Sequence, residues 1–128
     1  MREILLVAIG GGIGAALRHL VGVAAIRIMG FGFPWGTLTV NVLGSFAMGL
    51  LVATLARFGP DIGAKELRLL LGVGVLGGFT TFSSFSLDAV VLYEGGHGTT
   101  AGLYVAASVV LGLTALFAGL GIVRWVAP

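Results

Sequence analysis

Four apolar runs, each long enough to cross a lipid bilayer, occupy most of this chain and limit what it can fold into. A membrane-spanning helix requires about 20 mostly apolar residues. The runs cover about residues 4–29, 37–56, 66–93 and 101–126. They predict an all-α membrane protein with four transmembrane helices, a multi-pass protein of the cell (inner or plasma) membrane. Residues 1–128 are expected to form a single four-helix domain without a linker.

The charge content supports this prediction and excludes several classes of protein. Only 9% of the residues are charged and 58% are hydrophobic, whereas a soluble domain carries about 25% charged residues. The chain contains no cysteine, which excludes disulfides, thiolate metal sites and cysteine nucleophiles. The net charge of +2 comes from scattered residues, so no nucleic acid is expected as a partner. No enzyme is expected either, because the two histidines lie far apart without acidic or nucleophilic neighbours.

The beginning of the chain imitates a dinucleotide-binding motif but fits close helix packing better. Gly10, Gly12 and Ala15 match the spacing G-x-G-x-x-A, which requires a soluble βαβ unit and an acidic residue about 20 positions further on. The corresponding region of this chain has no acid. Small residues four apart instead let membrane helices approach closely. Such pairs recur along the chain: Gly10–Gly14, Ser45–Gly49, Gly74–Gly78 and Gly98–Gly102.

Polar residues at helical spacing interrupt the apolar runs. Residues three or four apart lie on one face of a helix, and polar groups at membrane depth usually face a bundle interior or a water-filled path. A single hydroxyl often bonds only its own backbone, so the combination of several lines carries the argument. The lines are Gly10, Gly14 and Arg18; Thr37, Asn41, Ser45 and Gly49; Phe82, Phe85 and Asp88; and Thr100, Tyr104, Ser108 and Gly112.

Several of these residues also have a plainer interpretation. The phenylalanines alone would indicate core packing, and Tyr104 would fit an interfacial anchor. Asp88 and Arg18 could simply reach the lipid headgroups. Asn41 is the costliest of the set to bury and has no local structural use, so it favours a functional role.

The third run contains a segment, GGFTTFSSFS (residues 77–86), that suits neither a lipid-facing helix nor a core. Gly77 and Gly78, followed by the β-branched Thr80 and Thr81, weaken a helix. A break there frees carbonyl and N–H groups, which in hydrocarbon must be satisfied by protein, water or an ion. Broken helices hold ions in this way in transporters. The sequence therefore predicts a break in this segment with a buried ion beside it.

The chemistry of the polar lines favours a small anion over a cation. Amides and hydroxyls donate hydrogen bonds, and the edge of a phenyl ring is its positive part. Donors without a full charge suit an anion that must shed water, bind and still leave. A cation path would favour acidic rings, and the five acidic residues lie mostly near the ends of the runs. The residues alone do not identify the anion.

Three segments together resemble the signature segments of the Fluc/CrcB family of fluoride channels. They are GGGIGAALRH (residues 10–19), FPWGTLTVNVLGSFAMG (residues 33–49) and GGFTTFSSFS (residues 77–86), and the resemblance covers essentially the whole chain. It implies a passive fluoride-selective channel that exports fluoride from the microbial cytoplasm. It also implies a dual-topology dimer of two antiparallel subunits in membrane lipid, with two narrow pores at the interface.

The resemblance further implies roles for individual residues. The pore phenylalanines of the family fall on Phe82 and Phe85, and the pore asparagine falls on Asn41. A structural Na⁺ at the dimer centre is expected to bind the backbone carbonyls of Gly77 and Thr80 from both subunits. The other pore residues are expected to be Tyr104, Ser108, Thr81 and Ser83, with Arg18 and Asp88 in the vestibule.

The chain departs from the family pattern at three positions. Phe79 replaces a more usual leucine, and its orientation is left open. His19 stands where an aromatic residue is common. Gly112 offers no hydroxyl where some relatives extend the polar track, so the end of the path near this residue is also left open.

The basic residues bear on the assembly because Lys and Arg in loops favour the cytoplasm. On the side of the termini and the second connection lie Arg2, Arg57, Lys65, Arg68 and Arg124, and on the opposite side only Arg27. This bias predicts cytoplasmic termini and would suit pairing with an oppositely oriented paralogue. A homodimer is nevertheless preferred, because Arg68 and Arg124 lie at span ends and count weakly.

Two other functions would fit a short four-spanning protein. Drug–proton antiporters of the small multidrug resistance type depend on a glutamate embedded in the first span, whereas this run has only Glu3 at its edge. A non-conducting membrane assembly subunit would explain the small residues but not the polar lines. The fluoride channel is therefore the preferred function.

Overall fold

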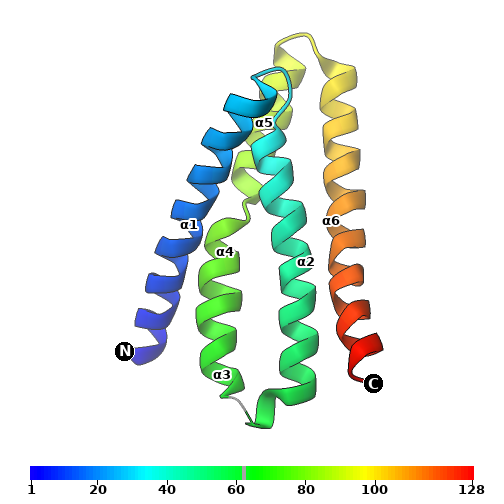
Figure 1. The fold of residues 1–128 in the computed structure, drawn as a ribbon. Coiled ribbons are helices and arrows are strands. Elements are labelled where there is room, and N and C mark those ends of the chain that lie inside the picture. Colours follow the sequence, from blue (N-terminus) through cyan, green and yellow to red (C-terminus); the bar gives the residue numbers. More distant parts are fainter. Residues whose placement is uncertain (62) are drawn as a thin grey trace.

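The computed structural model describes residues 1–61 and 63–128. Helices account for nearly all of this part of the chain, which confirms the predicted all-α membrane protein (Figure 1). The helices that are long and apolar enough to cross a membrane begin and end within a few residues of the predicted bounds. They are Arg2–Met29, Trp35–Phe58, Ala64–Glu94 and Gly98–Val126.

Three of these spans are single continuous helices, and the third is composite. The continuous ones are α1 (Arg2–Met29), α2 (Trp35–Phe58) and α6 (Gly98–Val126). The short helix η1 (Gly59–Asp61) follows α2. The third span begins as α3 (Ala64–Leu67) and continues in the wider π-helical form as η2 (Arg68–Leu76), then α4 (Gly77–Phe79) and, after a break, α5 (Phe82–Glu94).

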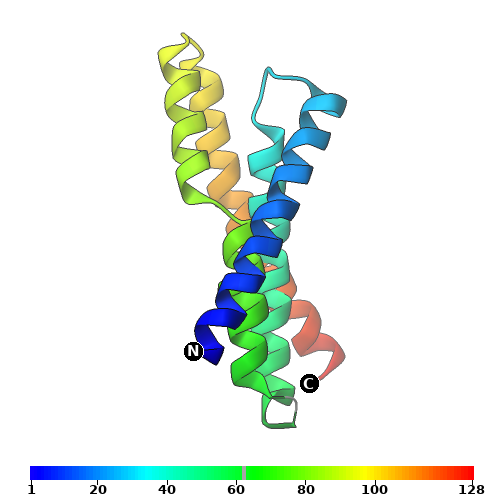
Figure 2. The ribbon, with the colours of Figure 1, turned by 90° about the vertical axis from the view of Figure 1, so that its left-hand side faces the viewer.

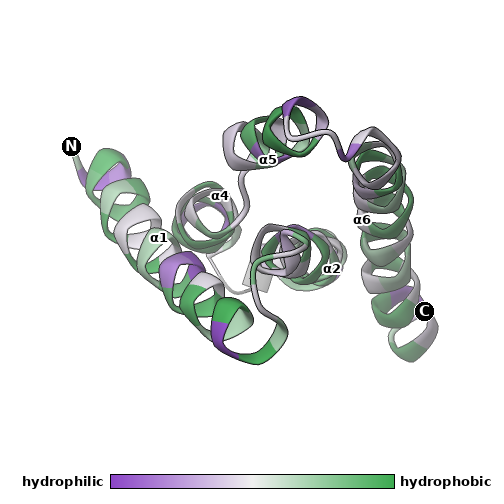
Figure 3. Ribbon diagram, turned by 90° about the horizontal axis from the view of Figure 1, so that it is seen from above, coloured by the Kyte–Doolittle hydropathy of each residue, from purple (hydrophilic) through white to green (hydrophobic). Residues whose placement is uncertain are grey.

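The helices stand side by side, with α2 and the first part of the third span between α1 and α6 (Figures 1 and 3). Both termini and η1 lie at one end of the bundle (Figure 1), which we call the terminal end. At the opposite end the bundle divides: α5 and α6 lean away from the connection between α1 and α2 (Figure 2). Hydrophobic residues predominate on every span (Figure 3), as a lipid environment requires.

Glycines bring the backbones of neighbouring spans into contact. A Cβ placed on Gly14 would lie 2.8 Å from the nitrogen of Phe79, and one on Gly78 would lie 3.1 Å from the nitrogen of Ala15. Likewise, a Cβ on Gly49 of α2 would lie 3.0 Å from the nitrogen of Leu120 in α6. The small-residue pairs predicted for α1, α2 and the first part of the third span therefore pack as expected.

The fourth predicted pair of small residues does not pack. A Cβ on Gly102 would meet no other atom within 4 Å, and one on Gly98 would only approach the ring of Tyr93 at 3.8 Å. The reason is the tilt of the bundle at this end, where α6 contacts α5 rather than a second glycine-bearing helix. A pair of small residues four positions apart therefore permits close helix packing but does not by itself produce it.

Candidate functional site

The third span breaks at two consecutive threonines. Thr80 has φ −82° and ψ 158°, and Thr81 has φ −154° and ψ 121°, so both residues are extended. The break agrees with the prediction, but Gly77 and Gly78 remain helical and the β-branched residues leave the helix. An extended backbone suits β-branched side chains. Thr81 then caps α5, because its Oγ1 accepts a hydrogen bond of 3.1 Å from the N–H of Ser84.

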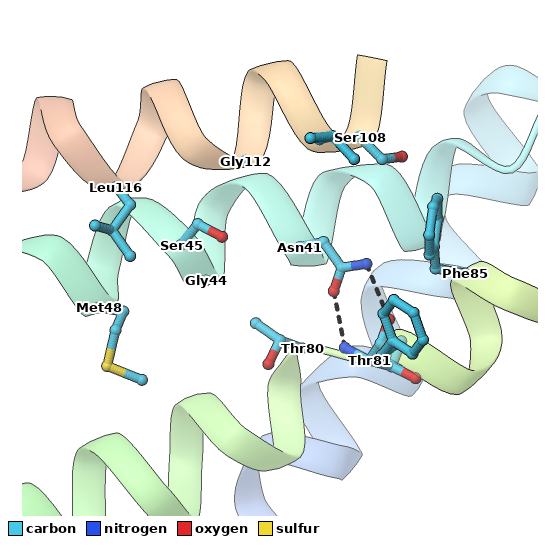
Figure 4. Close-up of a pocket in the computed structure, with 12 residues that line it drawn as sticks. Asn41, Gly44, Ser45, Met48, Thr80, Thr81, Phe85, Ser108, Gly112 and Leu116 are labelled. Atoms are coloured by element: carbon cyan, nitrogen blue, oxygen red, sulfur yellow. Dashed lines mark hydrogen bonds between the residues drawn. The ribbon is translucent and has the colours of Figure 1, made fainter. Parts of the chain in front are cut away.

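Asn41 of α2 holds the break from the side. Its Oδ1 accepts a hydrogen bond of 2.8 Å from the N–H of Thr81, and its Nδ2 donates one of 3.0 Å to the carbonyl oxygen of Thr81. Figure 4 shows the two residues pointing toward each other. The side-chain amide thus pairs with both backbone polar groups of one extended residue, which satisfies groups that hydrocarbon would leave without partners.

A cavity of about 360 Å³ lies beside the break, between α2, α5 and α6 (Figure 4). Of the predicted pore residues, Asn41, Thr81, Phe82, Phe85 and Ser108 line it. None of its lining residues carries a charge. Uncharged donors and aromatic rings from three helices are therefore brought together around one space.

Ser108 contributes a hydroxyl that is free to act in this cavity. Its Oγ is buried and has no hydrogen-bond partner among the residues that the structure describes. A buried hydroxyl without a partner is unusual, because a buried polar group that makes no hydrogen bond costs about 1–3 kcal/mol in stability. Ser108 therefore presents to the cavity a hydroxyl that no described residue engages.

The aromatic rings form a short row next to the cavity. The ring centroids of Phe82 and Phe85 are 5.7 Å apart, and those of Phe85 and Tyr104 are 5.3 Å apart. The side chain of Phe82 is 80% exposed, whereas Phe85 is partly covered. In a bundle of this size, an exposed ring at the middle of a span faces lipid or another subunit.

Two of the predicted pore residues, Tyr104 and Ser83, do not line this cavity. Tyr104 is fully buried and its hydroxyl donates a hydrogen bond of 3.1 Å to Oδ2 of Asp88. The hydroxyl of Ser83 lies 3.4 Å from Oγ1 of Thr81, and Ser83 itself is exposed. Tyr104 and Asp88 thus form a pair behind Phe85, and their predicted roles in conduction stay predictions.

Arg18 lies on the other side of the break, at a second cavity of about 300 Å³. Its Nη1 donates a long hydrogen bond of 3.4 Å to the carbonyl oxygen of Thr80. His19 of α1, Thr37 of α2 and Ser84 of α5 also line this cavity. Arg18 therefore places a positive charge next to the break, and its predicted role in a vestibule stays a prediction.

The backbone carbonyls predicted to bind Na⁺ belong to the first residue of α4, Gly77, and to the residue that follows it, Thr80. In a continuous α-helix the carbonyl of Gly77 would accept a hydrogen bond from the N–H of Thr81, but Asn41 takes that N–H. Gly77 is exposed, and the oxygen of Thr80 receives only the long contact from Arg18 among the described residues. Neutral carbonyl oxygens suit a hard cation, and the oxygen of Gly77 fits Na⁺ better than that of Thr80, which accepts from the guanidinium of Arg18.

Several residues that complete the cavity wall were not predicted from the sequence. Gly44, Met48 and Leu116 line it together with the predicted residues (Figure 4). Gly44 and Met48 follow Asn41 by three and seven positions, so helical spacing could have found them. Gly44 packs directly on the methyl group of Thr80, leaving no room for a side chain at that position.

Comparisons with known proteins agree with the resemblance found in the sequence. The family model described as "CrcB-like protein, Camphor Resistance (CrcB)" matches residues 5–120. A protein of Rhizobium etli named "Fluoride-specific ion channel FluC" is 54% identical over 125 residues, covering 97% of this chain and 98% of the relative. Proteins of the same name from Mesorhizobium japonicum and Chelativorans sp. are 51% and 57% identical over 124 residues, covering 97% of this chain and 98% of each relative. The chain therefore belongs to the CrcB family.

Proposed function

We propose that this chain forms a passive, fluoride-selective channel that exports fluoride from the cytoplasm. The names of its relatives support fluoride as the transported ion and a channel rather than an enzyme. The observation that carries the proposal is the cavity beside the break, which amide and hydroxyl groups and phenyl rings line without a single charged side chain. Such a lining suits a small anion better than a cation.

The donors in the cavity would replace water around a fluoride ion. The hydroxyl of Ser108 has no partner within the described residues, so it is available to donate to the ion. The ring edges of Phe82 and Phe85 add weak positive potential. Because none of these groups carries a full charge, the ion binds well enough to enter and weakly enough to leave.

A second copy of the chain in antiparallel orientation would complete the pore. Phe82 is 80% exposed and also lines the cavity. Two antiparallel copies that meet at the break would close two such cavities, one for each subunit, and would cover both phenylalanines. The oppositely oriented paralogue stays an alternative partner, because the basic residues cluster at the terminal end.

The proposed Na⁺ belongs to this assembly. The carbonyl oxygens of Gly77 and Thr80 from both subunits would hold it at the dimer centre. When bound, the ion would balance the negative ends of the carbonyl dipoles and join the two broken helices. The Arg18 side chain, which faces the second cavity, would attract anions to the entrance.

The structure offers no support for the antiporter. Glu3, the only acidic residue of α1, forms an ion pair with Lys65 at the terminal end of the bundle. Both side chains are mostly exposed, so this carboxylate is not embedded in the membrane. A non-conducting assembly subunit would leave the unpartnered hydroxyl of Ser108 without a purpose.

Efflux from liposomes tests the proposed function. The purified chain alone is reconstituted into liposomes loaded with fluoride or with chloride, and release is followed with ion-selective electrodes in the presence of a K⁺ ionophore. We expect fast release of fluoride and negligible release of chloride. Equal release of both anions would contradict the selectivity, and release of neither would contradict a channel made from this chain alone.

A further inference from the structure

The two hydrogen bonds of Asn41 are the only ones that join α2 to the third span within the described residues. They involve both the backbone N–H and the backbone carbonyl of Thr81, as the hydrogen bonds from a neighbouring β-strand would. The distances of 2.8 and 3.0 Å are those of well-formed hydrogen bonds. Asn41 therefore acts on the backbone of the break, in addition to lining the cavity.

Because Oδ1 of Asn41 accepts the N–H of Thr81, one carbonyl of the third span loses the donor that a continuous helix would give it. In an uninterrupted helix the N–H of Thr81 would bond to the carbonyl of Gly77, four residues earlier. Here that N–H donates to Oδ1 of Asn41 instead. The helix before the break still closes normally, because the N–H and the hydroxyl of Thr80 both donate to the carbonyl of Leu76. The first carbonyl released by the break is that of Gly77.

We propose that Asn41 is a positioning residue for the cation site: by taking the N–H of Thr81, it keeps the carbonyl oxygen of Gly77 free to bind Na⁺. This inference rests on the proposed cation site and assigns to it a side chain that does not touch the ion. Without Asn41, the N–H of Thr81 would lose its partner in a membrane interior, and the carbonyl of Gly77 is the acceptor that helical geometry offers it. The cation would then lose a ligand.

This role is compatible with a place for Asn41 in the fluoride path. A side-chain amide carries two N–H donors, and Thr81 uses only one of them. The second N–H is available to the cavity that Asn41 lines. One side chain would thus connect the anion path with the cation site, each through a different atom.

The test is the Na⁺ dependence of thermal stability in detergent. Thermal unfolding of the purified protein is measured over a series of Na⁺ concentrations at constant ionic strength, with N-methyl-D-glucamine as the replacement cation. Stability rises with Na⁺ if the native state binds the ion, and the midpoint of the rise reports the affinity. The wild-type protein is expected to show this rise, and its absence would overturn the proposal.

Two variants and a control separate a positioning role from a structural one. Asn41→Leu removes the acceptor and is expected to raise the Na⁺ midpoint at least roughly tenfold, as loss of a supporting group around a metal ligand does. Asn41→Asp keeps an acceptor for Thr81 and is expected to leave the midpoint equal to or lower than that of the wild type. Thr39→Val, a polar-to-apolar change in the same helix, is expected to leave the midpoint unchanged.

A merely structural role would lower the unfolding temperature of Asn41→Leu by the same amount at every Na⁺ concentration, and this result would overturn the proposal. An equal rise of the midpoint in Asn41→Asp would overturn it as well. If Asn41→Leu does not fold, Asn41→Ser takes its place, because its side chain is too short to reach Thr81. Efflux of fluoride by the wild-type protein is measured separately, so failure of the channel function is distinguishable from failure of this inference.

Discussion

The two parts of the third span, before and after the break, use their residues in different ways. Before the break, η2 and α4 pack on α1 through glycines, and backbone approaches backbone. After the break, α5 packs mainly on α6 and carries the rings of Phe82 and Phe85 to the cavity. The first part therefore supplies a rigid support by close packing, and the second supplies the chemistry. The extended residues Thr80 and Thr81 separate the two.

The difference follows from what stabilises each part in lipid. Membrane helices associate by van der Waals packing and hydrogen bonds, because lipid tails are as apolar as the helices. Before the break, small residues maximise the packing. After it, the hydrogen bonds among Asn41, Thr81 and Ser84, and that between Tyr104 and Asp88, hold the polar groups in place. Substitutions before the break should thus affect folding, and substitutions of the rings after it should affect conduction.

The largest effect is expected from Gly14→Leu at the packed interface. A Cβ on Gly14 would lie 2.8 Å from the backbone nitrogen of Phe79, and backbone cannot move away as a flexible side chain would. We expect a loss of about 3 kcal/mol or more in stability, measured as loss of the folded peak in size-exclusion chromatography. Gly102→Leu is the matched control, because nothing lies within 4 Å of a Cβ there. An equal loss of stability in both variants would contradict the claim that close glycine packing supports the part before the break.

An intermediate effect, on conduction alone, is expected from Phe82→Ile. The ring is 80% exposed in the single chain, so its loss removes little packing within the subunit, but it removes a ring edge from the cavity. We expect fluoride efflux to fall roughly tenfold, which corresponds to about 1.4 kcal/mol in the barrier, with an unchanged unfolding temperature of the subunit. Wild-type efflux rates in this variant would remove Phe82 from the path.

The smallest effect is expected behind the row of rings, from Asp88→Asn. Asp88→Leu would leave the fully buried hydroxyl of Tyr104 without its acceptor, at a cost of about 1–3 kcal/mol in stability. Asp88→Asn keeps an acceptor oxygen and should lose less than about 1 kcal/mol. Thermal unfolding of the two variants checks this order. Identical stabilities would mean that the hydrogen bond does not hold Tyr104.

The overall fold was predictable from the sequence because hydrocarbon imposes strong constraints. The apolar runs predicted the four spans within a few residues, and helical spacing predicted the glycine contacts of α1 with the third span. The weak helical segment near Gly77 predicted the break. The contact predicted from the same spacing for Gly98 and Gly102 is not formed within the subunit, because the sequence does not tell which helix lies opposite a small residue.

The connections within the site could not be predicted in the same way. Nothing in the spacing of Asn41 indicates that its amide binds the backbone of Thr81, since the two residues are 40 positions apart. Similarly, hydropathy does not distinguish the π-helical turns of η2 from α-helical ones, because the composition of the segment is the same in either form. Contacts between distant residues depend on how the spans are placed, and apolar patterns leave this placement open.

A chemical block of the cavity tests most directly whether fluoride passes through it. The natural chain has no cysteine, so Ser108→Cys provides a single reactive thiol at the cavity wall, and methyl methanethiosulfonate would add a methylthio group there. If fluoride passes through this cavity, fluoride efflux falls in proportion to the fraction labelled, and the reagent does not affect the unaltered protein. Full labelling of Ser108→Cys with unchanged fluoride efflux would contradict the claim that fluoride passes through this cavity.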